Sequence, residues 1–194
     1  MAGRPKIFDE QNVIDKAIEV FWKKGYEAAS AEELLKAMNI GKGSFYFSFK
    51  GGKKELYEKA LEQFSNTGVE RFNAALANAN NPVEFLKNFF LSMADSPKER
   101  QLKGCYLGNA IIEMANIDNK TKNKAAKLLA RLEGSFKTII EKAQQDKLIR
   151  TNENPELLAR LLINLWNGIN ITRIMYPESD SLKRMIELQL EVLK

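Results

Sequence analysis

The chain has 194 residues, 44% of them hydrophobic and 28% charged, with a formal net charge of +5, one cysteine and no histidine. This composition is that of a folded globular protein, and it excludes a disordered chain, an internal disulfide and a His-based metal site. No run of about 18 apolar residues and no apolar signal region at the N-terminus are present, so we expect no membrane segment and a cytoplasmic location. No cofactor is indicated.

Apolar residues at helical spacing predict three short helices in the first 50 residues, over 9–25, 30–39 and 42–48. Ser30 begins the second helix and is followed three residues later by Glu33, which is the pattern of a capping box. Asn39 is typical of a helix end, because it tolerates the left-handed backbone conformation. A turn at 39–41 then joins the second helix to the third.

The rest of the chain has the same period. Further helices are predicted over 52–76, 82–95, 103–115, 119–145, 155–176 and from about Ser181 to the C-terminus. No segment shows the alternation of a strand. The sequence therefore predicts an all-α protein of about nine helices. We expect an N-terminal helix-turn-helix DNA-binding domain at 1–50 and a helical ligand-binding and dimerisation domain at 51–194.

The second and third helices, joined by a short turn, describe a helix-turn-helix, whose second helix enters the major groove of DNA. Residues 41–54 contain four lysines and no acidic residue, which favours contact with phosphates. Phe45 and Phe49, four residues apart, are predicted to face the protein core. The candidate DNA-binding residues are Ser30, Lys42, Gly43, Ser44, Tyr46, Phe47 and Ser48, followed by Lys50, Lys53 and Lys54 at the start of the next helix.

Residues 17–56, "AIEVFWKKGYEAASAEELLKAMNIGKGSFYFSFKGGKKEL", resemble the tetracycline-repressor (TetR/AcrR) family of transcriptional regulators. The family motifs are matched by Gly25-Tyr26, Lys42-Gly43, Phe45-Tyr46 and Phe49. The resemblance implies a homodimer that binds a palindromic operator on double-stranded DNA. It also implies a C-terminal domain that dimerises through its last two helices and holds a pocket for a small-molecule effector.

The C-terminal residues suggest both a pocket and a partner surface. Aromatic and methionine side chains with sparse polar groups suit a small ligand; the alternative is that they are ordinary core. The candidates are Phe89, Met93, Tyr106, Asn109, Met114, Trp166 and Asn170. The stretch "LLARLLINLWNGI" at 157–169 is apolar on more sides than its own chain can cover, so we expect part of it to contact a second copy.

Two further features each allow a functional interpretation and a purely structural one. Cys105 follows Gly104 at a predicted helix start, where the helix dipole lowers a thiol pKa, and Lys103 is adjacent. It is a possible redox sensor, with a small, half-buried apolar residue as the alternative. Arg4-Pro5-Lys6 is a candidate minor-groove arm, with a frayed tail as the alternative.

Three functions are compatible with these patterns. The first is a ligand-responsive DNA-binding regulator, most simply a repressor. The second is a helical small-ligand carrier or interaction protein that has lost DNA binding, which Ala29 and Gly41 permit. The third is an enzyme with Cys105 as nucleophile, but no histidine is available as its base and residues 41–56 stay unexplained. We therefore expect a regulator and not an enzyme.

Overall fold

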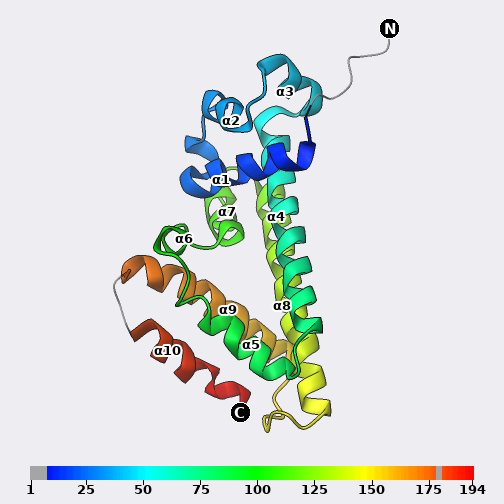
Figure 1. Ribbon diagram of the computed structural model, residues 1–194, viewed down its shortest axis with the longest axis vertical. Helices are drawn as coiled ribbons and strands as arrows, with labels where there is room; N and C mark the ends of the chain where they lie inside the picture. The colour runs from blue at the N-terminus through cyan, green and yellow to red at the C-terminus, as the bar shows by residue number, and fades with distance from the viewer. Residues whose placement is uncertain (1–7, 178–180) are drawn as a thin grey trace. The chain divides into compact units, whose positions relative to one another are not determined.

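The computed structural model describes residues 8–177 and 181–194, and every regular element in these ranges is helical (Figure 1). The elements are α1 Glu10–Ala28, α2 Ala31–Met38, α3 Lys42–Ser48, α4 Gly52–Ala77, α5 Pro82–Leu91, α6 Lys98–Leu102, α7 Tyr106–Met114, α8 Asn119–Gln145, α9 Pro155–Met175, α10 Ser181–Gln189 and the 3₁₀ helix η1 Leu190–Leu193. The predicted all-α class is confirmed. The candidate arm at 4–6 lies outside the described residues.

Local signals determine where several helices begin. The Ser30 hydroxyl accepts from the Glu33 amide while the Glu33 carboxylate accepts from the Ser30 amide, so the predicted capping box is present. Asn81 and Asn154 cap α5 and α9 through their side-chain oxygens, which accept from the second and third amides of each helix, and each is followed by proline at the first helical position. These ends require no tertiary contact, which is why the sequence predicts them.

The structure adds one helix to those expected. The five residues of α6 form a short, mostly polar helix after Pro97, with no buried side chain. A helix of this length shows no apolar period, so the sequence pattern did not indicate it. Among the described helices, none is long and apolar enough to cross a membrane.

The first compact unit combines two separate parts of the chain: the described residues up to Gly68, and Asn109–Leu128. Figure 1 shows α1, α2 and α3 around the beginning of α4 in this unit. Its core consists of side chains from all four helices, among them Ile14, Phe21, Leu34, Met38, Phe45, Phe49, Leu56 and Leu61. The predicted domain boundary at residue 50 falls inside this unit and stays a prediction.

The second unit comprises Val69–Gly108 and Leu129–Lys194. Its core is rich in aromatic rings: Phe72, Phe90 and Phe136 are buried, with Phe72 edge-on and Phe90 tilted against Phe136. Within this unit α10 contacts both α9 and α5 (Figure 1). The last two helices, α10 and η1, contribute four buried side chains to this core: Leu182, Ile186, Leu190 and Leu193.

Candidate nucleic-acid interface

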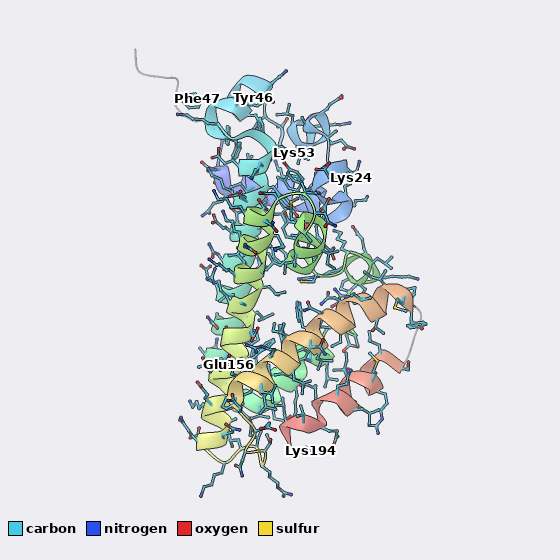
Figure 2. All side chains as sticks on the ribbon, turned by 180° about the vertical axis from the view of Figure 1, so that it is seen from behind. Lys24, Tyr46, Phe47, Lys53, Glu156 and Lys194 are labelled. Atoms are coloured by element: carbon cyan, nitrogen blue, oxygen red, sulfur yellow. The ribbon has the colours of Figure 1, made fainter. Side chains whose placement is uncertain are left out.

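Helix α3 has one buried face and one exposed face. Phe45 and Phe49 are 5% and 0% exposed, so the prediction that they hold the helix against the core is confirmed. Tyr46 and Phe47 lie between them in the chain but are 51% and 64% exposed, and Figure 2 shows both at the α3 end of the first unit. Two successive exposed aromatic residues on a short helix are typical of a binding surface.

The turn before α3 presents the first residues of that helix to solvent. Asn39 adopts the left-handed conformation (φ 55°, ψ 45°) and ends α2, as the sequence predicted. Gly41 then precedes α3 in an extended conformation without a side-chain cap. Lys42, Gly43 and Ser44 are all exposed in the first turn of α3, where the predicted DNA contacts require them.

The four lysines of residues 41–54 fall into two pairs. Lys42 and Lys50 are exposed. The Lys53 ammonium donates to the Glu27 carbonyl at 3.2 Å and lies 4.6 Å from the centre of the Tyr26 ring.

Lys54 forms an ion pair with Asp118 at 2.7 Å. That hydrogen bond raises the pKa of the Lys54 ammonium. Lys53 and Lys54 therefore have partners inside the protein, which the sequence pattern did not reveal.

The two serines among the candidates differ in their surroundings. The Ser30 hydroxyl is exposed but engaged with Glu33, which also forms an ion pair with Lys24. This contact from Lys24, with two further hydrogen bonds from Ser30, lowers the pKa of the Glu33 carboxyl to about 2. The Ser48 hydroxyl oxygen is buried, without a hydrogen-bond partner in the described part of the chain. The structure thus places Ser48 away from the exposed face of α3.

Residues 109–128 supply contacts to α1 and α4, the helices before and after the helix-turn-helix, that sequence reasoning missed. The Glu113 carboxylate accepts from the backbone amides of Tyr26 and Glu27 at 2.8 and 3.0 Å. Asp118 accepts from the Thr121 amide at the start of α8 while it pairs with Lys54. We call Glu113 and Asp118, the two acidic residues that hold α1 and α4, the acidic clasp. No sequence signal marks Glu113, whereas Asp118 has the spacing of a helix cap.

A cavity of about 260 Å³ lies beside the acidic clasp. It is lined by Tyr26, Lys54, Tyr57, Met114, Ile117, Asp118 and Thr121. Met114, a predicted ligand-binding residue, therefore lies in the first unit and next to this cavity. Asn109, another candidate, is exposed in the same unit.

The comparisons with known proteins identify the family. Residues 13–60 match the bacterial regulatory proteins of the tetR family, and residues 82–188 match the tetracyclin repressor-like C-terminal domain. The chain belongs to the tetR family. The family, the all-α fold and the role as a transcriptional regulator that binds double-stranded DNA, all predicted above, are thereby confirmed.

Relatives resemble this tetR-family protein along nearly its whole length. The HTH-type transcriptional repressor DhaR of Mycobacterium sp. (strain GP1) is 24% identical over 94% of this chain and 91% of its own. A TetR-family regulator from Cytophaga hutchinsonii superposes with a TM-score of 0.84 at 23% identity, covering 94% of this chain and 92% of that one. CifR, solved with 26-base-pair operator DNA, gives 0.80 at 20% identity, covering 98% and 100%.

Five of the predicted ligand-binding residues of this tetR-family chain lie in its second unit: Phe89, Met93, Tyr106, Trp166 and Asn170. The rings of Phe89 and Trp166 stack at 5.5 Å with an interplanar angle of 6°. Asn170 donates to the Trp166 carbonyl at 2.8 Å, and its own oxygen accepts from Arg173. Aromatic rings and buried polar groups thus occur together here, and their role in ligand binding stays a prediction.

Cys105 lies in the same unit, buried, just before α7. The Trp166 indole and the Gly108 amide both donate to its sulfur at 3.3 Å. Burial nevertheless dominates and raises the pKa of the thiol. The expectation that the helix start lowers this pKa is wrong, because desolvation of the thiolate outweighs the hydrogen bonds to its sulfur and the charge of Arg173.

Proposed function

We propose that this protein is a homodimeric repressor that binds a palindromic operator through α3 of each protomer and is released by a small-molecule effector. The observation that carries the proposal is the division of α3: Phe45 and Phe49 anchor the helix, while Lys42, Tyr46 and Phe47 are exposed. Lysines contact phosphates and fix the register, whereas exposed apolar rings contact thymine methyl groups. The repressor DhaR and operator-bound CifR support this function.

The exposed face of α9 supports the homodimer. Six exposed residues follow one another at spacings of four, three, four, three and four: Leu157, Leu161, Asn164, Gly168, Ile171 and Met175. This is the spacing of a seam between two packed helices. A side chain on Gly168 would meet nothing within 4 Å in the protomer, so a partner helix has room to approach there. We call these six residues the α9 seam, and Leu188 adds an exposed apolar side chain on α10.

A repressor with this arrangement works by a shift between two states. A dimer that holds its two α3 helices one DNA turn apart binds both half-sites, whereas a dimer with a different spacing binds only one half-site tightly. An effector that prefers the second spacing reduces operator binding in proportion to that preference. We expect the protein to act in the cytoplasm, where the DNA is, and we propose no catalytic reaction for it.

Fluorescence anisotropy with DNA from upstream of the protein's own gene, against a scrambled duplex, tests the proposal. We expect tight binding to the first duplex at moderate salt and much weaker binding to the second. Lys42→Ala should weaken both and reduce the salt slope by about 0.9, the effect of one lost phosphate contact. Lys142→Ala, an exposed helical lysine in the second unit, is the matched control and should leave the slope unchanged.

Phe47→Ala separates sequence recognition from charge. It should weaken binding to the upstream duplex while leaving scrambled DNA and the salt slope unaffected, because no phosphate contact is lost. Equal, steeply salt-dependent binding of wild type to both duplexes would contradict an operator-specific repressor. Absence of binding to either duplex would instead favour the carrier function, in which the helix-turn-helix no longer contacts DNA.

A further inference from the structure

Arg173 is a buried cation, and its hydrogen-bond acceptors among the described residues are neutral. It lies on α9 with 5% of its surface exposed. Its Nη2 atom donates to the Asn170 side-chain oxygen at 2.6 Å and to the Gly104 carbonyl at 3.5 Å. Its Nε atom is buried without a hydrogen-bond partner, and no carboxylate among the described residues forms an ion pair with it. A buried charge is costly unless an opposite charge accompanies it.

The ionisable neighbours of Arg173 do not supply the missing negative charge. Burial raises the pKa of the Cys105 thiol, so this group is neutral near pH 7. Burial lowers the pKa of the Arg173 guanidinium, against a smaller raising effect of Cys105, and the positive charge of Arg100 lowers it further. Glu178 and Asp180 lie outside the described residues, and the experiment below includes them.

The groups around Arg173 are suited to an organic anion. A guanidinium is planar and binds a carboxylate through two parallel N–H donors. The Asn170 side chain accepts from Arg173 and donates to the backbone carbonyl of Trp166, whose ring stacks on Phe89. Trp166 and Arg173 are seven residues apart on α9, so they lie on the same side of that helix. An aromatic surface and a fixed cation on one side of a helix suit a ligand with an apolar body and one carboxylate. All four residues belong to the second unit.

We propose that Arg173 binds the carboxylate of a small organic acid, so that the effector of this regulator is a monocarboxylate. The regulatory part of this inference rests on the proposed function, but the binding of the acid does not. Binding of the acid completes the charge pair that the protein alone leaves open. Removal of the guanidinium should therefore abolish the preference for the charged form of a ligand over a neutral one of equal shape.

The test uses the full-length protein without DNA. Acetate, butyrate and benzoate are titrated against their neutral amides, and thermal unfolding and the fluorescence of Trp166 in a Trp22→Phe background are recorded. We expect at least one carboxylate to raise the melting temperature and change the fluorescence while its amide does neither. Arg173→Met should weaken that binding roughly tenfold or more, as expected for a lost charge-assisted hydrogen bond. Arg184→Met, an exposed arginine on α10, is the control and should bind as wild type does.

The stability of the ligand-free variants provides a second readout. Arg173→Met should unfold at the same temperature as wild type or higher, because it removes a charge that has no partner. Equal binding of acid and amide throughout the series, or unchanged carboxylate binding in Arg173→Met, would overturn the proposal. A carboxylate effect seen only in Glu178→Gln/Asp180→Asn would overturn it too, since the chain would then supply the counter-charge. None of these results depends on operator binding, so the two proposals fail separately.

Discussion

The carboxylate of Glu113 occupies the space in which a side chain on Gly25 would lie. A Cβ atom built on Gly25 would be 2.9 Å from the nearer Glu113 oxygen. Gly25 has φ 82° and ψ 175°, a conformation that is essentially restricted to glycine. It breaks α1 and turns the amides of the next two residues toward Glu113. Gly25-Tyr26 therefore joins α1 to α7.

Gly25→Ala should destabilise the protein by about 1–3 kcal/mol, because alanine does not adopt this backbone conformation without strain. Urea unfolding measures the difference. Gly68→Ala is the matched control: Gly68 lies within α4 with nothing near its would-be Cβ atom. That substitution should stabilise the protein by roughly 0.5–1 kcal/mol. A loss of stability in both variants would contradict the special role of Gly25.

Combining Gly25→Ala with Glu113→Ala separates backbone strain from the clash. Glu113→Ala alone should cost about 1–2 kcal/mol, since two backbone amides lose their acceptor. In that background Gly25→Ala should cost less than in wild type, because the carboxylate is no longer in the way. The difference is the coupling energy of the pair. Strict additivity of the two substitutions would show that Glu113 moves aside freely.

The sequence predicts those parts of the fold that depend on neighbours in the chain. Ser30 with Glu33, and the Asn-Pro pairs that begin α5 and α9, determine helix starts through contacts three residues apart or fewer. The four-residue spacing of Phe45 and Phe49 likewise predicts which face of α3 is buried. Such local rules act alike in any globular protein, so they can be applied before the fold is known.

Contacts between residues far apart in the chain could not be predicted from the sequence pattern. Glu113 and Tyr26 are 87 positions apart, and nothing in either segment marks the other. The partners of Lys53 and Lys54 were missed for the same reason. For Cys105 the local argument gave the wrong direction, because burial in the second unit raises its pKa more than the hydrogen bond from Trp166, 61 positions away, lowers it. Burial is a property of the whole unit.

The link between Lys54 and Asp118 should make stability depend on pH. The hydrogen bond from Lys54, followed by those from Thr121, lowers the pKa of the Asp118 carboxyl below its ordinary value of 3.8. A carboxyl with a depressed pKa stabilises the folded state above its ordinary pKa, and this contribution is lost as the pH falls toward the folded value. The melting-temperature difference between wild type and Asp118→Asn should thus be constant from about pH 5 to 8 and shrink below about pH 4.

Thr121→Val serves as the comparison for this prediction, because it removes a hydroxyl donor to Asp118 but keeps the Lys54 ion pair. The stability difference between this variant and wild type should shrink less at low pH. A difference between wild type and Asp118→Asn that persists unchanged to pH 2 would contradict an ionised Asp118 as the stabilising group.

Charge on the α9 seam should separate the proposed dimer. Ile171 is 54% exposed in the protomer, so glutamate there costs the fold little but places two like charges at a closed interface. We expect Ile171→Glu to sediment as a monomer and to lose operator binding. Ile112→Glu, which alters an isoleucine on α7 that is 69% exposed, should remain dimeric. Identical sedimentation of the two variants would place the interface elsewhere.

Cys105 should react slowly with alkylating agents in the folded protein. Its thiol is buried, and burial raises its pKa above the ordinary value of 9.0, so little thiolate forms at pH 7. The rate of iodoacetamide labelling should be much lower than in urea-unfolded protein, and its pH midpoint should be higher. Rapid labelling of the folded chain at pH 7 would favour the sensor role that the sequence suggested.

Gly43→Ala should raise stability and lower operator affinity at the same time. Gly43 is helical and exposed in α3, and a Cβ atom there would meet nothing within 4 Å. Alanine should therefore stabilise the free protein by roughly 0.5–1 kcal/mol. The added methyl group lies next to Lys42, where the proposed interface brings backbone close to phosphate, so it should hold the DNA away. Gly134→Ala in α8, equally unobstructed, should stabilise the protein without affecting the anisotropy titration, and full operator affinity in Gly43→Ala would remove Gly43 from the contact surface.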